Sequence, residues 1–174
     1  ETWVDSALKS FTSRNFKVIG ETGHVYGYGK SVWAMIDLDT RQPADILAVR
    51  GGLITEYIET EYSCPIEKLS RVKMSADATP VRSIDTYYND VDINGHINSV
   101  KYIEHMLDLW DVAWYKQHRI KRFEIAYVAE SHQGDKLHFY REQRGTETDF
   151  NVRITKSNVE REETEVCRCR VQFV

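Results

Sequence analysis

The sequence predicts an α+β protein in which one long helix lies on an antiparallel sheet. Two observations support this fold class. Residues 81–174 contain one strand pattern, then a long amphipathic helix pattern, then four consecutive strand patterns joined by short turns. Residues 1–39 add three more strand patterns rich in β-branched and aromatic residues. A chain of 174 residues can bury one good core or two small, tightly fused ones.

The first strands are expected at residues 3–11, 15–20 and 25–38. Polar pairs and a glycine separate them, at residues 12–13 and 21–23. Residues 40–80 then change character and form a connection between two units. Within it, a short helix is expected at residues 43–49, ended by Gly51 and Gly52.

Residues 81–174 form a self-contained pattern. A strand at 82–88 leads through a polar loop at 89–96 into a helix at 97–115. One side of that helix carries, at helical spacing, Val100, Ile103, Met106, Leu107, Trp110 and Trp114. His105 is expected on the opposite side. Strands follow at 120–130, 137–142, 149–155 and 164–174.

The loop before this helix concentrates polar chemistry. Between Asp90 and Asn98, nine residues hold two carboxylates, two amides and the imidazole of His96. The free N–H groups of a helix start follow directly, so the segment can aim donors and polar side chains at one spot. Acyl-transfer or hydrolytic chemistry fits such a segment. The alternative is a simple capping turn, because Asp and Asn favour helix N-caps.

Composition limits the partners and the compartment. A net charge of −4 gives no reason to expect nucleic acid as a partner, and no apolar run reaches the roughly 18–20 residues needed to cross a membrane. Cys167 and Cys169 are expected to be reduced core thiols, facing the same side as Val171 and Phe173, in a cytoplasmic protein. Nothing suggests a metal or organic cofactor. The chain starts at Glu1 without Met, so we expect its true N-terminus to be missing.

Several stretches resemble the fatty acyl-ACP thioesterases, in particular their bacterial branch. The run from Asp90 to Glu104 resembles the active-site motif of that family. Residues 14–16, 31–36 and 40–43 resemble the end of its first hotdog domain, and residues 123–130 resemble the strand that brings its catalytic carboxylate. The likeness covers essentially the whole chain.

The resemblance implies a hotdog fold, in which a curved antiparallel sheet wraps a long helix. It implies a complete C-terminal hotdog domain at 81–174, a connection at 40–80 and the C-terminal part of a first hotdog domain at 1–39. The opening strand and helix of that first domain have no counterpart. An incomplete domain would expose apolar surface, and a homodimer is one arrangement that would cover it.

The resemblance also implies site residues: Asp92, Asn94, His96 and Glu130. Glu130 and His96 would polarise a water, Asn94 would orient it or bind the oxyanion, and Asp92 would hold the group together or act as the base. Plant members carry a Cys directly after the glutamate, whereas this chain has Ser131. An activated water is therefore favoured, and a Ser131–His96 pair is the alternative.

The expected function is hydrolysis of acyl–acyl carrier protein, which releases free fatty acid and terminates fatty acid synthesis. Alternatives are an acyl-CoA thioesterase, a hydroxyacyl dehydratase of the hotdog fold, or an inactive acyl-binding fragment. A basic cluster is a candidate docking patch for the acidic carrier protein, although it also fits a solvated turn. The cluster comprises Lys116, His118, Arg119, Lys121 and Arg122.

Overall fold

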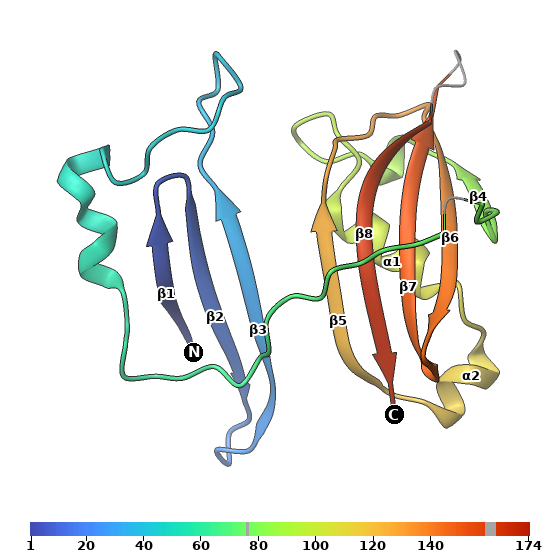
Figure 1. Cartoon of the computed structure of the whole chain (residues 1–174), viewed down its shortest axis with the longest axis horizontal. Helices are drawn as coiled ribbons and strands as arrows, with labels where there is room; N and C mark the ends of the chain where they lie inside the picture. Colours follow the sequence, from blue (N-terminus) through green and yellow to red (C-terminus); the bar gives the residue numbers. More distant parts are fainter. Residues whose placement is uncertain (76, 159–162) are drawn as a thin grey trace. The chain divides into compact units, whose positions relative to one another are not determined.

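The chain forms two compact units, Glu1–Lys68 and Leu69–Val174, and each is described by itself. The structure is a computed structural model that describes residues 1–75, 77–158 and 163–174 (Figure 1). No described helix is long and apolar enough to cross a membrane.

The first unit is a three-stranded antiparallel sheet in the order β1-β2-β3. Its strands are β1 (Thr2–Leu8), β2 (Phe11–Ile19) and β3 (Val25–Ala34). A 3-10 helical segment, η1 (Val49–Tyr57), follows, and a bridge between Val4 and Ile58 ties its end to β1. Val4 is the one apolar side chain of this unit that is fully buried, so the unit has little core of its own.

Two predicted boundaries in this unit are wrong. The chain turns between β1 and β2 at residues 9–10, not at 12–13. Ser13 and Asn15 pair with β1 and β3 as part of β2, and their side chains donate to the carboxylate of Asp5 at 3.2 and 3.1 Å. The helix expected at 43–49 is also wrong. Helical turns begin at Val49 instead, and Gly51 lies within η1 with a φ of 66°.

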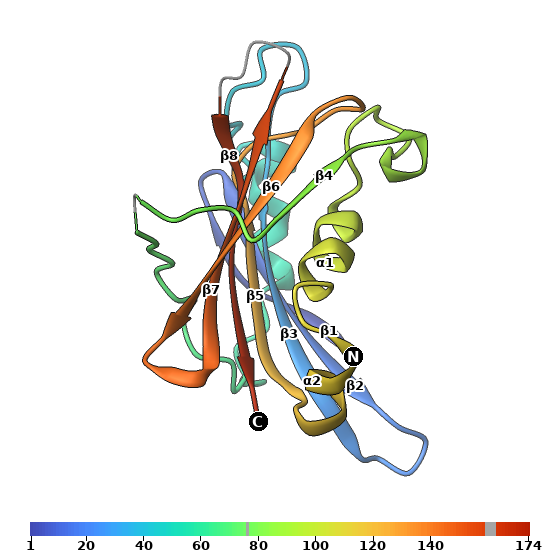
Figure 2. The same cartoon turned by 90° about the vertical axis from the view of Figure 1, so that its right-hand side faces the viewer.

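The second unit is a five-stranded antiparallel sheet in the order β4-β6-β7-β8-β5. Its strands are β4 (Arg82–Asp85), β5 (Ile120–Tyr127), β6 (Lys136–Arg144), β7 (Thr146–Ser157) and β8 (Glu163–Phe173). Figures 1 and 2 show helix α1 (Ser99–Leu107) against one face of this sheet. The predicted α+β hotdog fold is confirmed.

The core of this unit lies between α1 and the sheet. Tyr102, Met106 and Trp110 supply the helical side. The sheet side includes Leu137, Phe139, Val152, Ile154, Cys167, Cys169, Val171 and Phe173. Both thiols and both apolar neighbours on β8 are buried on this face, as their spacing predicted.

The single helix predicted at 97–115 is wrong, because it is two helices. After α1 the chain leaves helical geometry, and α2 (Val112–Gln117) begins at Asp111, whose carboxylate accepts the N–H of Trp114 at 2.8 Å. Val100, assigned to the apolar side, is 53% exposed. His105, assigned to the opposite side, is three-quarters covered and meets the edge of Phe139.

Candidate active site

The loop that carries the polar run is a tight turn closed by its own backbone. Val91 and Ile97 form an antiparallel bridge, and the N–H of Asp92 donates to the carbonyl of His96 at 2.8 Å. Gly95 has a φ of 82°, in the left-handed region where a side chain is strained. The turn therefore needs glycine at this position, and it fixes the point from which the side chain of His96 projects.

Asp92 holds this turn together. Its Oδ1 accepts the backbone N–H of Asn94 at 2.8 Å and that of His96 at 3.4 Å. Such a carboxylate replaces the backbone partners that a turn lacks. Asp92 is thus engaged with the loop that presents the imidazole.

His96 and Glu130 are brought together from two segments. Their Nε2 and Oε2 atoms lie 3.3 Å apart, and the side chains are 29% and 50% exposed. Glu130 lies just beyond the end of β5, and the N–H of Ile97 donates to the carbonyl of Ser131 at 2.8 Å. That bond fixes the loop after β5 against the loop before α1. A carboxylate beside a solvent-accessible imidazole can accept a proton from water.

Asn94 does not join this pair through its side chain. It is exposed, and among the described residues no hydrogen bond holds its amide group. The structure thus brings Asp92, His96 and Glu130 into one turn-and-loop unit and leaves the Asn94 amide open to solvent.

Ser131 is poorly placed to attack a substrate. It is fully buried, and its Oγ has no hydrogen-bond partner among the described residues, so it forms no hydrogen bond with His96. Burial also raises the pKa of the Cys167 thiol to about 12 and that of Cys169 well above its ordinary value. These buried groups are unsuited to the role of nucleophile, which is consistent with a water mechanism.

Two contacts near the site were missed by sequence reasoning. The ring of His132 meets that of His96 edge-on, with centroids 5.0 Å apart. His105 Nε2 lies 3.6 Å from Oδ1 of Asp90, whose other oxygen accepts the N–H of Tyr87 at 2.8 Å. The position of His132, two residues after Glu130, was the available signal. Residues 1–75, 77–158 and 163–174 contain no cluster of three or more His, Cys, Asp or Glu suited to a metal ion.

The basic cluster between α2 and β5 is only partly free. His118 stacks on Trp114 with ring centroids 3.7 Å apart, and Nε of Arg122 lies 2.6 Å from the carboxylate of Glu124. The other members, Lys116, Arg119 and Lys121, are exposed. The cluster thus offers three free cations rather than five charged or titratable groups.

Protein-family models match residues in both units of the chain. The family model of the acyl-ACP thioesterase C-terminal domain matches residues 73–174, and that of the N-terminal domain matches residues 1–49. A palmitoyl-acyl carrier protein thioesterase of Gossypium hirsutum is 26% identical over 137 residues, which are 75% of this chain and 32% of that protein. The chain therefore spans about a third of the length of such curated relatives.

Solved structures extend the comparison. An acyl-ACP thioesterase from Bacteroides thetaiotaomicron is 46% identical, with a TM-score of 0.88 over 99% of this chain and 67% of that one. A 12:0-ACP thioesterase from Umbellularia californica, at 21% identity, has a TM-score of 0.79 over 99% of this chain and 66% of its own. At 21% identity, the similarity to the Umbellularia californica enzyme shows a shared fold.

Proposed function

The chain belongs to the acyl-ACP thioesterase family, and from that premise we propose that it hydrolyses acyl–acyl carrier protein to free fatty acid. The observation that carries the proposal is the contact between His96 Nε2 and Glu130 Oε2 at 3.3 Å, in a loop that water can reach. Release of the acyl chain would end its elongation, so the proposed role lies in fatty acid biosynthesis.

In the proposed mechanism, a water held beside His96 and Glu130 attacks the carbonyl carbon of the thioester. The pair takes up one proton from this water as the new C–O bond forms. The C–S bond then breaks, and His96 returns the proton to the departing sulfur. The products are a carboxylic acid and the thiol of the carrier, so atoms and charges balance.

The other two expected residues have supporting roles in this proposal. Asp92 keeps its part in the turn, because its Oδ1 already accepts two backbone N–H groups. Glu130 therefore acts as the carboxylate of the water-activating pair. The amide of Asn94, exposed beside the helix start, would donate to the oxyanion or orient the water.

The proposed partner is the acidic acyl carrier protein. Lys116, Arg119 and Lys121 are exposed at the α2–β5 turn and would attract it by charge. A cytoplasmic location and a homodimer stay predictions.

The test is an assay of fatty acid release from acyl–acyl carrier protein and from acyl-CoA. We expect the chain to prefer the carrier-bound substrate, and the His96→Ala variant to lose about a hundredfold or more in kcat. His24→Ala, an exposed histidine of the first unit, is the matched control and should behave as wild type. Full release by the His96→Ala variant would remove His96 from the mechanism. No release by the unaltered chain would favour an acyl-binding fragment.

A further inference from the structure

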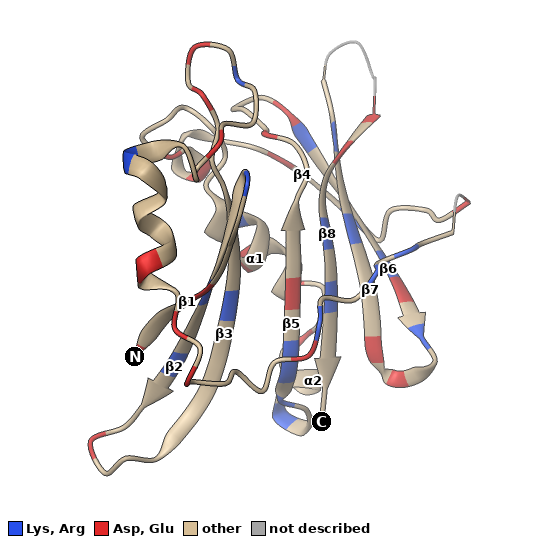
Figure 3. Ribbon diagram, turned by 60° about the vertical axis from the view of Figure 1, so that its left-hand side comes forward, with Lys and Arg blue, Asp and Glu red and all other residues tan. Residues whose placement is uncertain are grey.

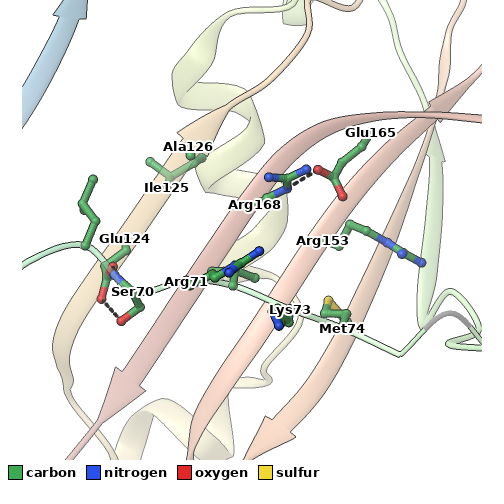
Figure 4. Close-up of a pocket in the computed structure, with 12 residues that line it drawn as sticks. Ser70, Arg71, Lys73, Met74, Glu124, Ile125, Ala126, Arg153, Glu165 and Arg168 are labelled. Atoms are coloured by element: carbon green, nitrogen blue, oxygen red, sulfur yellow. Dashed lines mark hydrogen bonds and ion pairs between the residues drawn. The ribbon is translucent and has the colours of Figure 1, made fainter.

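A cavity lies on the face of the five-stranded sheet opposite α1. Residues 69–74 cross this face, and the space between them and β5, β7 and β8 measures about 570 Å³ (Figure 4). Figure 2 shows α1 on one side of the sheet and this crossing segment on the other. The cavity shares no lining residue with the candidate active site, and its volume is typical of small-molecule sites.

The crossing segment is fixed to the sheet by polar contacts. The N–H and the hydroxyl of Ser70 donate to the carboxylate of Glu124, at 2.6 and 2.9 Å. The side-chain amide of Asn151 donates to the carbonyl of Lys73 at 2.9 Å. These contacts hold the wall of the cavity against the sheet.

The charge of the lining is unbalanced. It contains four cations, Arg71, Lys73, Arg153 and Arg168, and two carboxylates, Glu124 and Glu165. Figure 3 shows the basic residues running along β5, β7 and β8. Both carboxylates are already engaged: Glu124 binds Arg122 and Ser70, and Glu165 binds Arg168.

Two of the cations lie on neighbouring strands and differ in their contacts: Arg168 pairs with Glu165, and the guanidinium of Arg153 lies over the ring of Tyr140, 4.4 Å from its centroid. Arg153 of β7 and Arg168 of β8 are directly paired across the strands, where like charges destabilise a sheet. The Nε of Arg153 is buried and has no hydrogen-bond partner in the part of the chain that the structure describes. Over the same described ranges, no ion pair or hydrogen bond holds the side chain of Arg71 or Lys73. An anion in the cavity would pair with Arg71 and Lys73.

We propose that this cavity binds a small organic phosphate. Guanidinium groups match phosphate oxygens in geometry and charge, and Arg71 and Arg168 supply two of them to a lining that also includes Lys73. Leu69, Val72 and Ile125 form an apolar part of the lining that suits the organic portion. The site stands on its own contacts and does not depend on the proposed thioesterase activity.

The test uses the 174-residue chain with two probes, ADP and inorganic pyrophosphate, titrated in a calorimeter at low salt. We expect saturable binding of both, with ADP the tighter because pyrophosphate lacks an organic part. The Arg71→Ala variant should weaken ADP binding by about tenfold or more. Arg119→Ala removes an exposed cation outside the cavity and should change binding less than about twofold.

A second variant tests whether Arg168 contributes to ligand binding or only to the stability of the sheet. Arg168→Gln removes one cation of the lining and an exposed ion pair with Glu165 that contributes little to stability, so we expect a nearly unchanged Tm together with weaker ADP binding. A lower Tm with unchanged ADP affinity would overturn the proposal. So would the absence of saturable binding, equal binding by the Arg71→Ala variant, or pyrophosphate binding without ADP binding.

Discussion

His96 and Glu130 are 34 positions apart in the chain, and backbone hydrogen bonds decide that they meet. The N–H of Ile97 reaches the carbonyl of Ser131, and the carbonyl of Glu130 accepts from Nζ of Lys156 at 2.8 Å. The backbone that carries His96 and the backbone that carries Glu130 are therefore both hydrogen-bonded to neighbouring segments. Such ordering matters because a proton-transfer pair loses effectiveness when its geometry is loose.

At the same scale, Ser131 distinguishes a water mechanism from a covalent one. We expect Ser131→Ala to keep kcat for acyl–acyl carrier protein within about threefold, because the Oγ is buried and forms no hydrogen bond with His96. A true serine nucleophile would lose about 10⁴-fold or more on this change. Steady-state kinetics with the carrier-bound substrate decide between them, and a loss of that size would restore the Ser131–His96 alternative.

Residue-level predictability was uneven. The nine-residue polar run pointed to the site, but Glu130 was assigned only through the family resemblance, since nothing local distinguishes it from a solvated carboxylate. His132 and the pairing of Arg153 with Arg168 were missed, because each depends on how separate segments align. Strand register in particular is decided by the whole sheet and not by local pattern.

At the scale of elements, the β7–β8 pair carries a charged contact that makes stability depend on pH. Nε and Nη2 of Arg170 lie 2.9 and 2.7 Å from the two oxygens of Asp149, which is 7% exposed. Hydrogen bonding from Arg170 lowers the pKa of Asp149 below its ordinary value. A carboxyl with a lowered folded-state pKa stabilises the fold above its unfolded pKa, and this contribution is lost as the pH falls through the folded value.

Asp149→Asn should therefore lower the free energy of unfolding at pH 7 by about 1–3 kcal/mol. The loss relative to wild type should begin to shrink as the pH falls below about 4, because Asp149 of the unfolded chain becomes protonated first, and should shrink further as the pH falls through the lowered folded-state pKa. Denaturant unfolding at pH 7 and pH 3 measures both. Asp85→Asn, at an exposed 3.8 Å pair with Lys136, is the control and should be nearly neutral. A pH-independent difference for Asp149→Asn would refute the charge argument.

The turn between α2 and β5 carries the proposed docking cations. Reversing Arg119 and Lys121 to Glu should raise KM for acyl–acyl carrier protein about tenfold and leave KM for a small acyl thioester unchanged. Arg122 is left intact because it pairs with the buried Glu124, and its reversal would test folding instead. Equal effects on both substrates, measured at low and moderate salt, would remove the turn from carrier recognition.

Element prediction succeeded where periodicity was long and failed at breaks without glycine or proline. All five strands of the second unit were expected, with ends shifted by a few residues. The break between α1 and α2 was missed because the apolar pattern continues at helical spacing from Trp110 to Trp114. Asp111, the N-cap of α2, lies between these two residues. At residues 43–49 a helix was predicted from composition, but the segment is irregular there and the helical turns lie further along the chain, in η1.

At the scale of the whole molecule, buried apolar side chains are distributed unevenly. Apart from Val4, every fully buried hydrophobic side chain in the described ranges lies in Leu69–Val174. Local stability follows the number of buried apolar contacts, so the two units should open with different free energies. The strand patterns alone could not predict this difference, because both units show them; the family resemblance pointed to it, since it implied an incomplete first domain with exposed apolar surface.

Hydrogen exchange on the 174-residue chain at low concentration measures this difference directly. Amides of β7 and β8 should exchange more slowly than those of β2, by about a hundredfold or more, because their opening exposes the core of the second unit. Similar protection in both sheets would contradict the expected difference.

The central claim is that His96 and Glu130 act together to activate a water for thioester hydrolysis. A double-mutant cycle tests it most directly, with kcat/KM for acyl–acyl carrier protein measured for His96→Ala, Glu130→Gln and the combined variant. We predict that each single change lowers kcat/KM by about 10²–10⁴-fold. The double variant should have a kcat/KM only slightly below that of the less active single variant. Full activity in either single variant, or effects that simply multiply, would contradict the claim.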